Sequence, residues 1–134
     1  MNIFSLKTVK SDAGAVMQVR HPETEELIEG MTITLLGHDS HVYRRITTQR
    51  QQAALNRMAH GKKATKLDAE KLTEDGINDL VELTVGWTGF DDADGKPMPF
   101  DPLYVKNIYS DPGLSWLVDQ VREFVGDRSN FFGN

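Results

Sequence analysis

The chain has no cysteine, no long apolar run and no excess of positive charge. Without cysteine, disulfide bonds, thiol catalysis and thiolate metal sites are excluded. No apolar run approaches the roughly 20 residues that span a bilayer, and residues 1–7 lack the basic start and apolar centre of an export signal. The net charge of −5 argues against nonspecific nucleic-acid binding, which requires a basic surface. We therefore expect a protein that stays in the cytoplasm and binds neither membrane nor nucleic acid.

What the sequence does contain is the composition of a globular protein. Of its 134 residues, 39% are hydrophobic and 26% are charged. A chain of this length can bury about two-thirds of its unfolded surface. We predict an α+β fold in a single domain over residues 1–134, mainly helical, with a small N-terminal antiparallel β hairpin or meander.

The expected elements follow from hydrophobic spacing and from cap and turn residues. Residues 1–37 favour β structure, with strands at 15–20 and 31–36 and a candidate third strand at 3–9. Asp39 and Ser40 form an N-cap for a weakly amphipathic helix, predicted over 39–60, and residues 61–66 follow as a linker.

The predicted C-terminal half, residues 67–126, is helical. Gly76 is expected to break or kink its first helical run. Asp101 with Pro102, and Asp111 with Pro112, each predict a capped helix start. The last helix has the sharpest apolar stripe, which indicates either core or a self-association surface, and the tail 127–134 has no predicted regular structure.

The most informative stretch, Val85 to Pro102, holds three glycines and three prolines between two helical patterns. Glycine and proline restrict such a loop to a defined shape. The loop has no cysteine or histidine and no hydroxyl beside a base, so we predict a structural element and not a reaction centre. The structural loop and core anchors are predicted to be Trp87, Phe90, Phe100 and, in the last helix, Trp116.

Two groups of residues resemble metal sites without completing one. Asp92, Asp94 and Gly95 match part of a calcium loop, but Phe90 would occupy its first ligand position and the bidentate glutamate is missing, so a turn is the better interpretation. His38 and His41 are too few for a zinc site, and capping or surface roles are expected. We predict no metal, no cofactor, no catalytic residue and no enzymatic activity.

The two aromatic residues beyond the last helix, Phe131 and Phe132, form the candidate interface. They either fold back onto the body or offer an apolar anchor to another protein. A second candidate contact is electrostatic, because basic residues gather over 44–66 and acidic residues over 68–82. These segments could pair within the fold, pair between subunits, or form two solvated helix faces.

Several motifs, in order, resemble the tail assembly chaperones of long-tailed bacteriophages. They are an apolar run into a Gly-Trp-Thr-Gly turn, Asp-Gly-Lys-Pro with Pro-Phe, a Trp-Leu helix, and an Arg-x-Asn-Phe ending, at 80–90, 94–100, 116–125 and 127–132. The motif-bearing part covers about the C-terminal half. A weaker similarity lies at 20–24 and 37–40.

The resemblance implies a non-enzymatic protein of the host cytoplasm that is absent from the mature virion. Such chaperones coat the tape measure protein, keep it soluble and present it to the major tail protein for tail tube assembly, the latter through a longer form made by ribosomal frameshifting. This chain would be the short form, and self-association is expected. The alternative is a small cytoplasmic adaptor of unknown partner. As a division of roles, we expect the β hairpin and the helix at 40–59 to mediate contacts while the C-terminal half forms the core.

Overall fold

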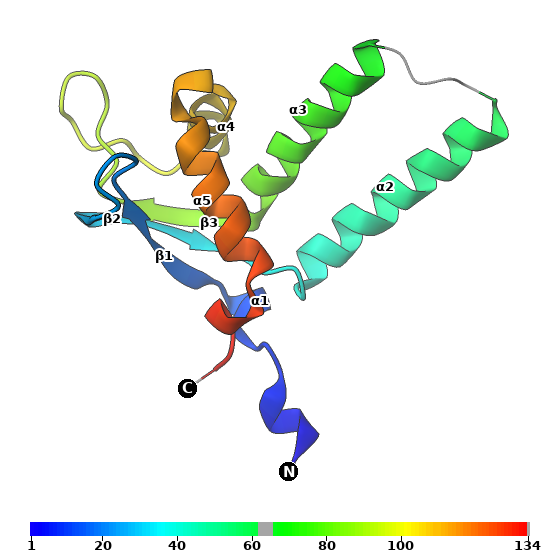
Figure 1. The fold of residues 1–134 in the computed structure, drawn as a ribbon, viewed down its shortest axis with the longest axis horizontal. Helices are drawn as coiled ribbons and strands as arrows, with labels where there is room; N and C mark the ends of the chain where they lie inside the picture. The colour runs from blue at the N-terminus through cyan, green and yellow to red at the C-terminus, as the bar shows by residue number, and fades with distance from the viewer. Residues whose placement is uncertain (62–65, 134) are drawn as a thin grey trace.

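The computed structural model of the chain describes residues 1–61 and 66–133, and the side chains of 66–69 are not described (Figure 1). It has an α+β fold with a three-stranded antiparallel sheet, which confirms the predicted class. With η denoting a 3-10 helix, the elements are η1 (Ile3–Leu6), α1 (Lys10–Ala13), β1 (Ala15–Arg20), β2 (Leu27–Leu35), α2 (His41–Ala59), α3 (Lys66–Leu83), β3 (Thr84–Thr88), α4 (Pro102–Ser110), η2 (Pro112–Leu114), α5 (Ser115–Gly126) and η3 (Arg128–Asn130).

The sheet contains the predicted hairpin, but its third strand comes from elsewhere in the chain. Strands β1 and β2 pair with Met17 opposite Ile33, and β3 pairs with the other edge of β2, with Trp87 opposite Ile33. The prediction of a third strand at residues 3–9 is therefore wrong. Residues 3–6 form η1 instead, where Asn2 Oδ1 accepts a hydrogen bond from Phe4 N at 3.0 Å.

The core lies between one face of the sheet and helices α4 and α5. Alternate residues of β1 point inward, and Val19 is fully buried there. Helix α5 contributes the predicted apolar stripe, Leu117, Val118, Val121 and Val125, all of which are buried. Of the two roles expected for this stripe, the structure gives it the core role.

Helix starts agree closely with the predicted caps. Ser40 Oγ accepts from Tyr43 N at 3.1 Å at the start of α2, and Asp101 Oδ1 accepts from Leu103 N at 2.8 Å at the start of α4. Asp111 instead caps η2, through Gly113 N at 2.9 Å, and α5 begins only at Ser115.

Three further predictions concern Gly76, the tail and the linker before α3. Helix α3 continues through Gly76, so the predicted break is absent. The tail forms η3, where Asp127 Oδ1 accepts from Ser129 N at 3.0 Å. Of the predicted linker, residues 62–65 lie outside the described residues, and Lys66 belongs to α3.

Candidate protein-interaction surfaces

The Gly-Trp-Thr-Gly motif and the loop after it form a structural cluster. Trp87 stacks on Phe90 with ring centroids 4.7 Å apart, and Phe100 meets the Trp87 ring edge-on at 5.4 Å. The indole Nε1 of Trp87 donates to Met98 O at 3.0 Å. Phe90 is buried, whereas Phe100 remains 37% exposed at the edge of the cluster. The aromatic residues of this motif therefore shape the loop that follows β3.

Gly89 explains why the motif contains glycine at its last position. Its φ is +77°, a left-handed conformation that side-chain-bearing residues rarely adopt. A Cβ atom at Gly89 would also overlap the carbonyl of Gly30, in the irregular part of β2. The turn therefore needs glycine both for its backbone angles and for the close approach of two strands.

The residues that resembled metal sites have protein partners. Asp92 Oδ1 accepts from Asp94 N at 2.9 Å and from Lys96 N at 3.0 Å, so its carboxylate closes the loop turn. His38 stacks on Tyr43 at 4.2 Å, and His41 Nδ1 lies 2.9 Å from Asp12 Oδ2. Among the described residues, no group of three or more potential ligands could hold a metal ion.

One buried polar pair joins α4 to the junction of α3 and β3. The Tyr109 hydroxyl lies 2.8 Å from Thr84 Oγ1, which donates to Leu80 O at 2.7 Å. Burial raises the pKa of Tyr109 to about 12. Both residues are buried, and the pair links α4 to the junction of α3 and β3 within the core.

The two aromatic residues of the candidate interface have different environments. Phe131 is only 1% exposed and packs edge-on against Phe124, with ring centroids 5.5 Å apart. Its carbonyl accepts from Lys10 N at 2.9 Å. Phe131 has therefore folded back and is not available to a partner, whereas Phe132 remains 40% exposed.

The tail is also held at the surface by Arg128. Its guanidinium donates to both carboxylate oxygens of Asp39, at 2.8 and 3.0 Å, and Thr8 Oγ1 donates to the same carboxylate at 2.9 Å. These hydrogen bonds, first from Arg128 and then from Thr8, lower the pKa of Asp39. The start of α2, the segment before α1 and the tail thus meet at one carboxylate.

Helices α2 and α3 extend together from one side of the body, as Figure 1 shows. Near the body they are joined by ion pairs of Arg45 with Glu82 and of Arg50 with Asp79. The basic and acidic segments therefore pair within the fold. Farther out, large apolar side chains are exposed; we call them the distal apolar residues, Leu55 and Met58 of α2 and Leu72 of α3.

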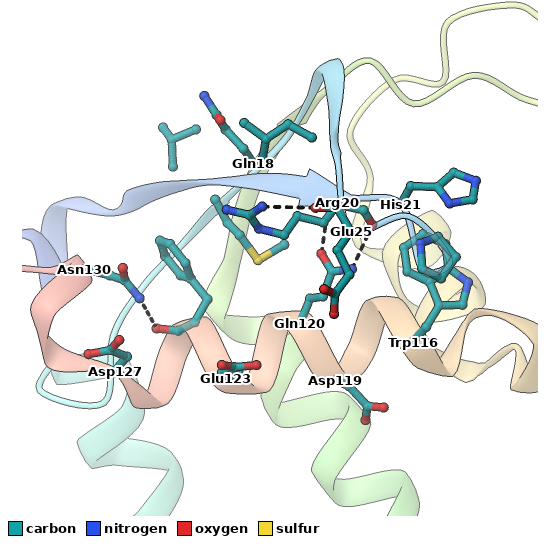
Figure 2. A pocket seen from close by; sticks show the side chains of 15 residues that line it. Gln18, Arg20, His21, Glu25, Trp116, Asp119, Gln120, Glu123, Asp127 and Asn130 are labelled. Atoms are coloured by element: carbon teal, nitrogen blue, oxygen red, sulfur yellow. Dashed lines mark hydrogen bonds between the residues drawn. The ribbon is translucent and has the colours of Figure 1, made fainter.

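A hollow of about 790 Å³ lies between β1 and α5 (Figure 2). Trp116 lines one end of it and Asn130 the other. The side chain of Gln120 bridges its walls, because Oε1 accepts from Arg20 N at 3.0 Å and Nε2 donates to Arg20 O at 2.9 Å. Four acidic residues line the hollow, Glu25, Asp119, Glu123 and Asp127, against the basic Arg20 and the neighbouring His21.

Sequence reasoning missed the hollow, the distal apolar residues as a group and the exposed segment before α1. In the segment 3–9, the apolar side chains of Ile3, Phe4, Leu6 and Val9 are exposed. The sequence predicted a strand here, but it did not identify a strand with which this segment would pair. Trp116 was expected in the core and is half-buried at the hollow.

Comparison with known protein families, characterised proteins and solved structures found no match to this chain. Across the part of the chain that the structure describes, no helix is both long enough and apolar enough to cross a membrane.

Proposed function

We propose that this chain is a bacteriophage tail assembly chaperone, which binds the tape measure protein and keeps it soluble while the tail tube is built with the major tail protein. It acts in the host cytoplasm as a non-enzymatic protein and leaves before the virion matures. The order of motifs from Leu80 to Phe132 supports the family. Gly89 and Trp87 give the first of those motifs a structural purpose, and the bond from Trp87 to Met98 O ties it to the second. Contact with the major tail protein belongs to the longer, frameshifted form.

The observation that carries the proposal is the exposure of α2. This helix has 19 residues, of which only Ile46 is buried. Leu55 and Met58 are 65% and 76% exposed, and their three-residue spacing puts them on the same side of the helix. A helix that leaves apolar side chains in water is suited to cover the apolar stripe of another helix.

Weak contacts of this kind are enough for a long client. Two or three distal apolar residues per copy give low affinity, but many copies along one chain add avidity without any tight pocket. This arrangement also lets each copy dissociate when the tail protein replaces it. The alternative, a monomeric adaptor, would bind one short partner and would not depend on these residues for the solubility of a long helical chain.

The test is co-expression with the tape measure protein from the same genome. We expect the client to remain soluble in a large complex that holds many copies of this chain. Leu55→Asp with Met58→Asp should return the client to the insoluble fraction, because two charges then face its apolar stripe. The matched control, Gln51→Asp with Gln52→Asp, adds the same charge at exposed polar positions of α2 and should preserve solubility. A client that aggregates beside the unaltered chain would contradict the proposal and favour the adaptor.

A further inference from the structure

The outer edge of β1 has backbone groups that no other strand pairs. In the strand order β1-β2-β3, β1 pairs on one side only. The backbone N–H and C=O of Arg20 point away from β2, because both bond to Gln120. Backbone groups alternate along a strand, and the unbroken burial alternation of β1 shows that it is not bulged. The N–H and C=O of Gln18 and Val16 therefore also point outward, and no described segment pairs with them.

The side chain of Gln120 shows that a peptide-like group fits between this edge and α5. Its Oε1 accepts from Arg20 N at 3.0 Å and its Nε2 donates to Arg20 O at 2.9 Å. An amide that exchanges both bonds with one residue repeats the pattern of a hydrogen-bonded antiparallel pair. Gln18 and Val16 offer two further positions of the same kind. An extended peptide that pairs with them would add an antiparallel strand to the sheet.

A strand added at this edge would direct alternate side chains toward α5. Met17 and Val19 are buried on the face of the sheet that packs against α5, whereas the side chains of Val16 and Gln18 are on the opposite face. Directly opposed residues of paired strands share a face. Peptide residues opposite Met17 and Val19 would therefore project toward α5, with N–H groups that point away from β1. Those opposite Val16 and Gln18 would form the backbone hydrogen bonds.

Helix α5 presents an evenly spaced row of carboxylates to the hollow, which we call the carboxylate row. Asp119, Glu123 and Asp127 follow one another at four-residue steps, are exposed and line the hollow (Figure 2). Four residues of a helix advance by about 6 Å, close to the roughly 7 Å between alternate residues of a strand. Asp119 and Glu123 form no ion pair with the described residues. The row therefore matches basic side chains at alternate positions of an extended segment.

We propose that this hollow binds an extended segment of another protein that carries Lys or Arg at three alternate positions. The segment pairs with the outer edge of β1, and its basic side chains lie against the carboxylate row. Gln120 ends the site, because it occupies the backbone groups of Arg20. The occupant is not a second copy, since no two basic residues within 1–134 are two positions apart. The inference concerns this hollow alone and does not rest on the proposed function.

The first experiment tests the backbone pairing without altering the protein. The probe is the peptide Lys-Thr-Lys-Thr-Lys, acetylated at its N-terminus and labelled with fluorescein at its C-terminus, and fluorescence anisotropy at low salt measures its dissociation constant. N-methylation of both Thr amides removes the two N–H groups that bond to β1 and should weaken binding about tenfold. The matched control is N-methylation of the second and third Lys amides. These N–H groups point away from β1, so binding should be retained.

The second experiment tests the carboxylate row. Asp119→Asn with Glu123→Gln removes two charges at exposed positions, so the fold is kept, and should weaken binding of the unmodified peptide by up to about tenfold at low salt. The matched control is Asp91→Asn with Asp94→Asn. It removes the same charge from the exposed loop after β3, which does not line the hollow, and should bind the peptide as the unaltered chain does.

Failure of the unmodified peptide to bind, or equal affinities of the two methylated peptides, would overturn strand addition. Equal weakening by the two pairs of substitutions would overturn the role of the carboxylate row and with it the choice of a basic occupant. The client test is separate, because it depends on Leu55 and Met58. A chain that binds the peptide but does not keep the tape measure protein soluble would contradict only the proposed function, and the opposite result would contradict only this inference.

Discussion

At the scale of single residues, Gly89 combines a left-handed backbone with a position where an added Cβ would overlap the carbonyl of Gly30. We expect Gly89→Ala to lower the free energy of unfolding by about 3 kcal/mol, because both the backbone angle and the close approach oppose a side chain. Gly86 belongs to the same motif, but an added Cβ there would meet only Thr34 Cβ, at 4.0 Å. Gly86→Ala should cost less than about 1 kcal/mol. Urea unfolding of both variants measures the difference, and equal losses would contradict this account.

Tyr109 gives the fold a dependence on alkaline pH. Its pKa is raised by burial to about 12, above the value of about 10 for an exposed tyrosine. The unfolded chain therefore loses this proton first as the pH rises. The stabilisation from Tyr109 is complete below about pH 10 and is lost between about pH 10 and 12, by about 3 kcal/mol in all.

Tyr109→Phe removes this titration. At neutral pH the variant should lose only about 1 kcal/mol, because Thr84 Oγ1 keeps its hydrogen bond to Leu80 O. Between about pH 9 and 12, its free energy of unfolding should fall less steeply than that of the unaltered chain. The measurement is urea unfolding of both proteins across this range, since other titrating groups cancel in the difference. Parallel curves would show that Tyr109 does not titrate with unfolding.

The structural role of a residue was easier to predict from the sequence than the identity of the residues it contacts. Trp87 and Phe90 were expected to anchor the loop and they stack within it. The partner of Gly89, however, is a residue of another strand, which no local pattern identifies. Phe131 and Phe132 are adjacent and chemically identical, yet one is buried and the other is exposed. Only the position of α5 and the segment before β1 decides between them.

At the scale of elements, Arg50 is one of two arginine residues of α2, with Arg45, that form ion pairs with α3. The Arg50 guanidinium contacts Asp79 and donates to Asp75 O at 3.3 Å. We expect Arg50→Ala to lower global stability by less than about 1 kcal/mol, because the pair is partly exposed. Amide hydrogen exchange in the middle of α2 should nevertheless become faster, since the helix opens locally more often.

The control for this experiment is Arg44→Ala. Arg44 is exposed in the same helix, and no ion pair is formed by it with the described residues. Exchange in α2 should then remain as in the unaltered chain, and exchange in β1 should be unchanged in both variants. A similar acceleration from both substitutions would assign the effect to helix composition and not to the link with α3.

Helix starts were predictable from the sequence because their caps are local. Ser40 and Asp101 act where the sequence places them. Strand β3 was missed because the apolar run from Leu80 to Phe90 fits both a helix and a strand. Its ending, Thr84–Thr88, becomes a strand because β2 offers an edge that pairs with it. Residues 3–9 show the opposite outcome: they have strand composition, but they pair with no described strand, and Ile3–Leu6 forms η1 instead.

At the scale of the whole molecule, Phe131 closes the fold. Its ring packs over Gly37, where an added Cβ would meet ring atoms at 3.1 Å. Phe131→Ala should destabilise the protein by about 3 to 5 kcal/mol through the cavity it leaves. Phe132→Ala removes a ring that is largely in water and should cost less than about 1 kcal/mol. Thermal and urea unfolding compare the two, and similar losses would mean that the tail does not close the core.

The overall arrangement could not be read from the sequence because it depends on distant pairs. Arg20 and Gln120, whose mutual bonds bridge the hollow, are 100 residues apart. From the charges alone, the basic and acidic segments could pair within the fold, pair between subunits or remain solvated, and the sequence did not decide among these three. The sequence therefore predicted which segments are folded, but the grooves and projecting helices follow from how those segments meet.

The packing of Phe131 against the first part of the chain also determines when the protein can finish folding. Gly37 and the Lys10 amide are synthesised early, but Phe131, the residue that covers them, is made about 90 residues after Gly37 and about 120 residues after Lys10. At about 5 to 20 residues per second, the ribosome takes on the order of 5 to 20 s to produce it. During that interval α1 and the start of α2 lack their cover. A nascent chain released before residue 131 would therefore carry its sheet and helices without the ring that holds its two ends together.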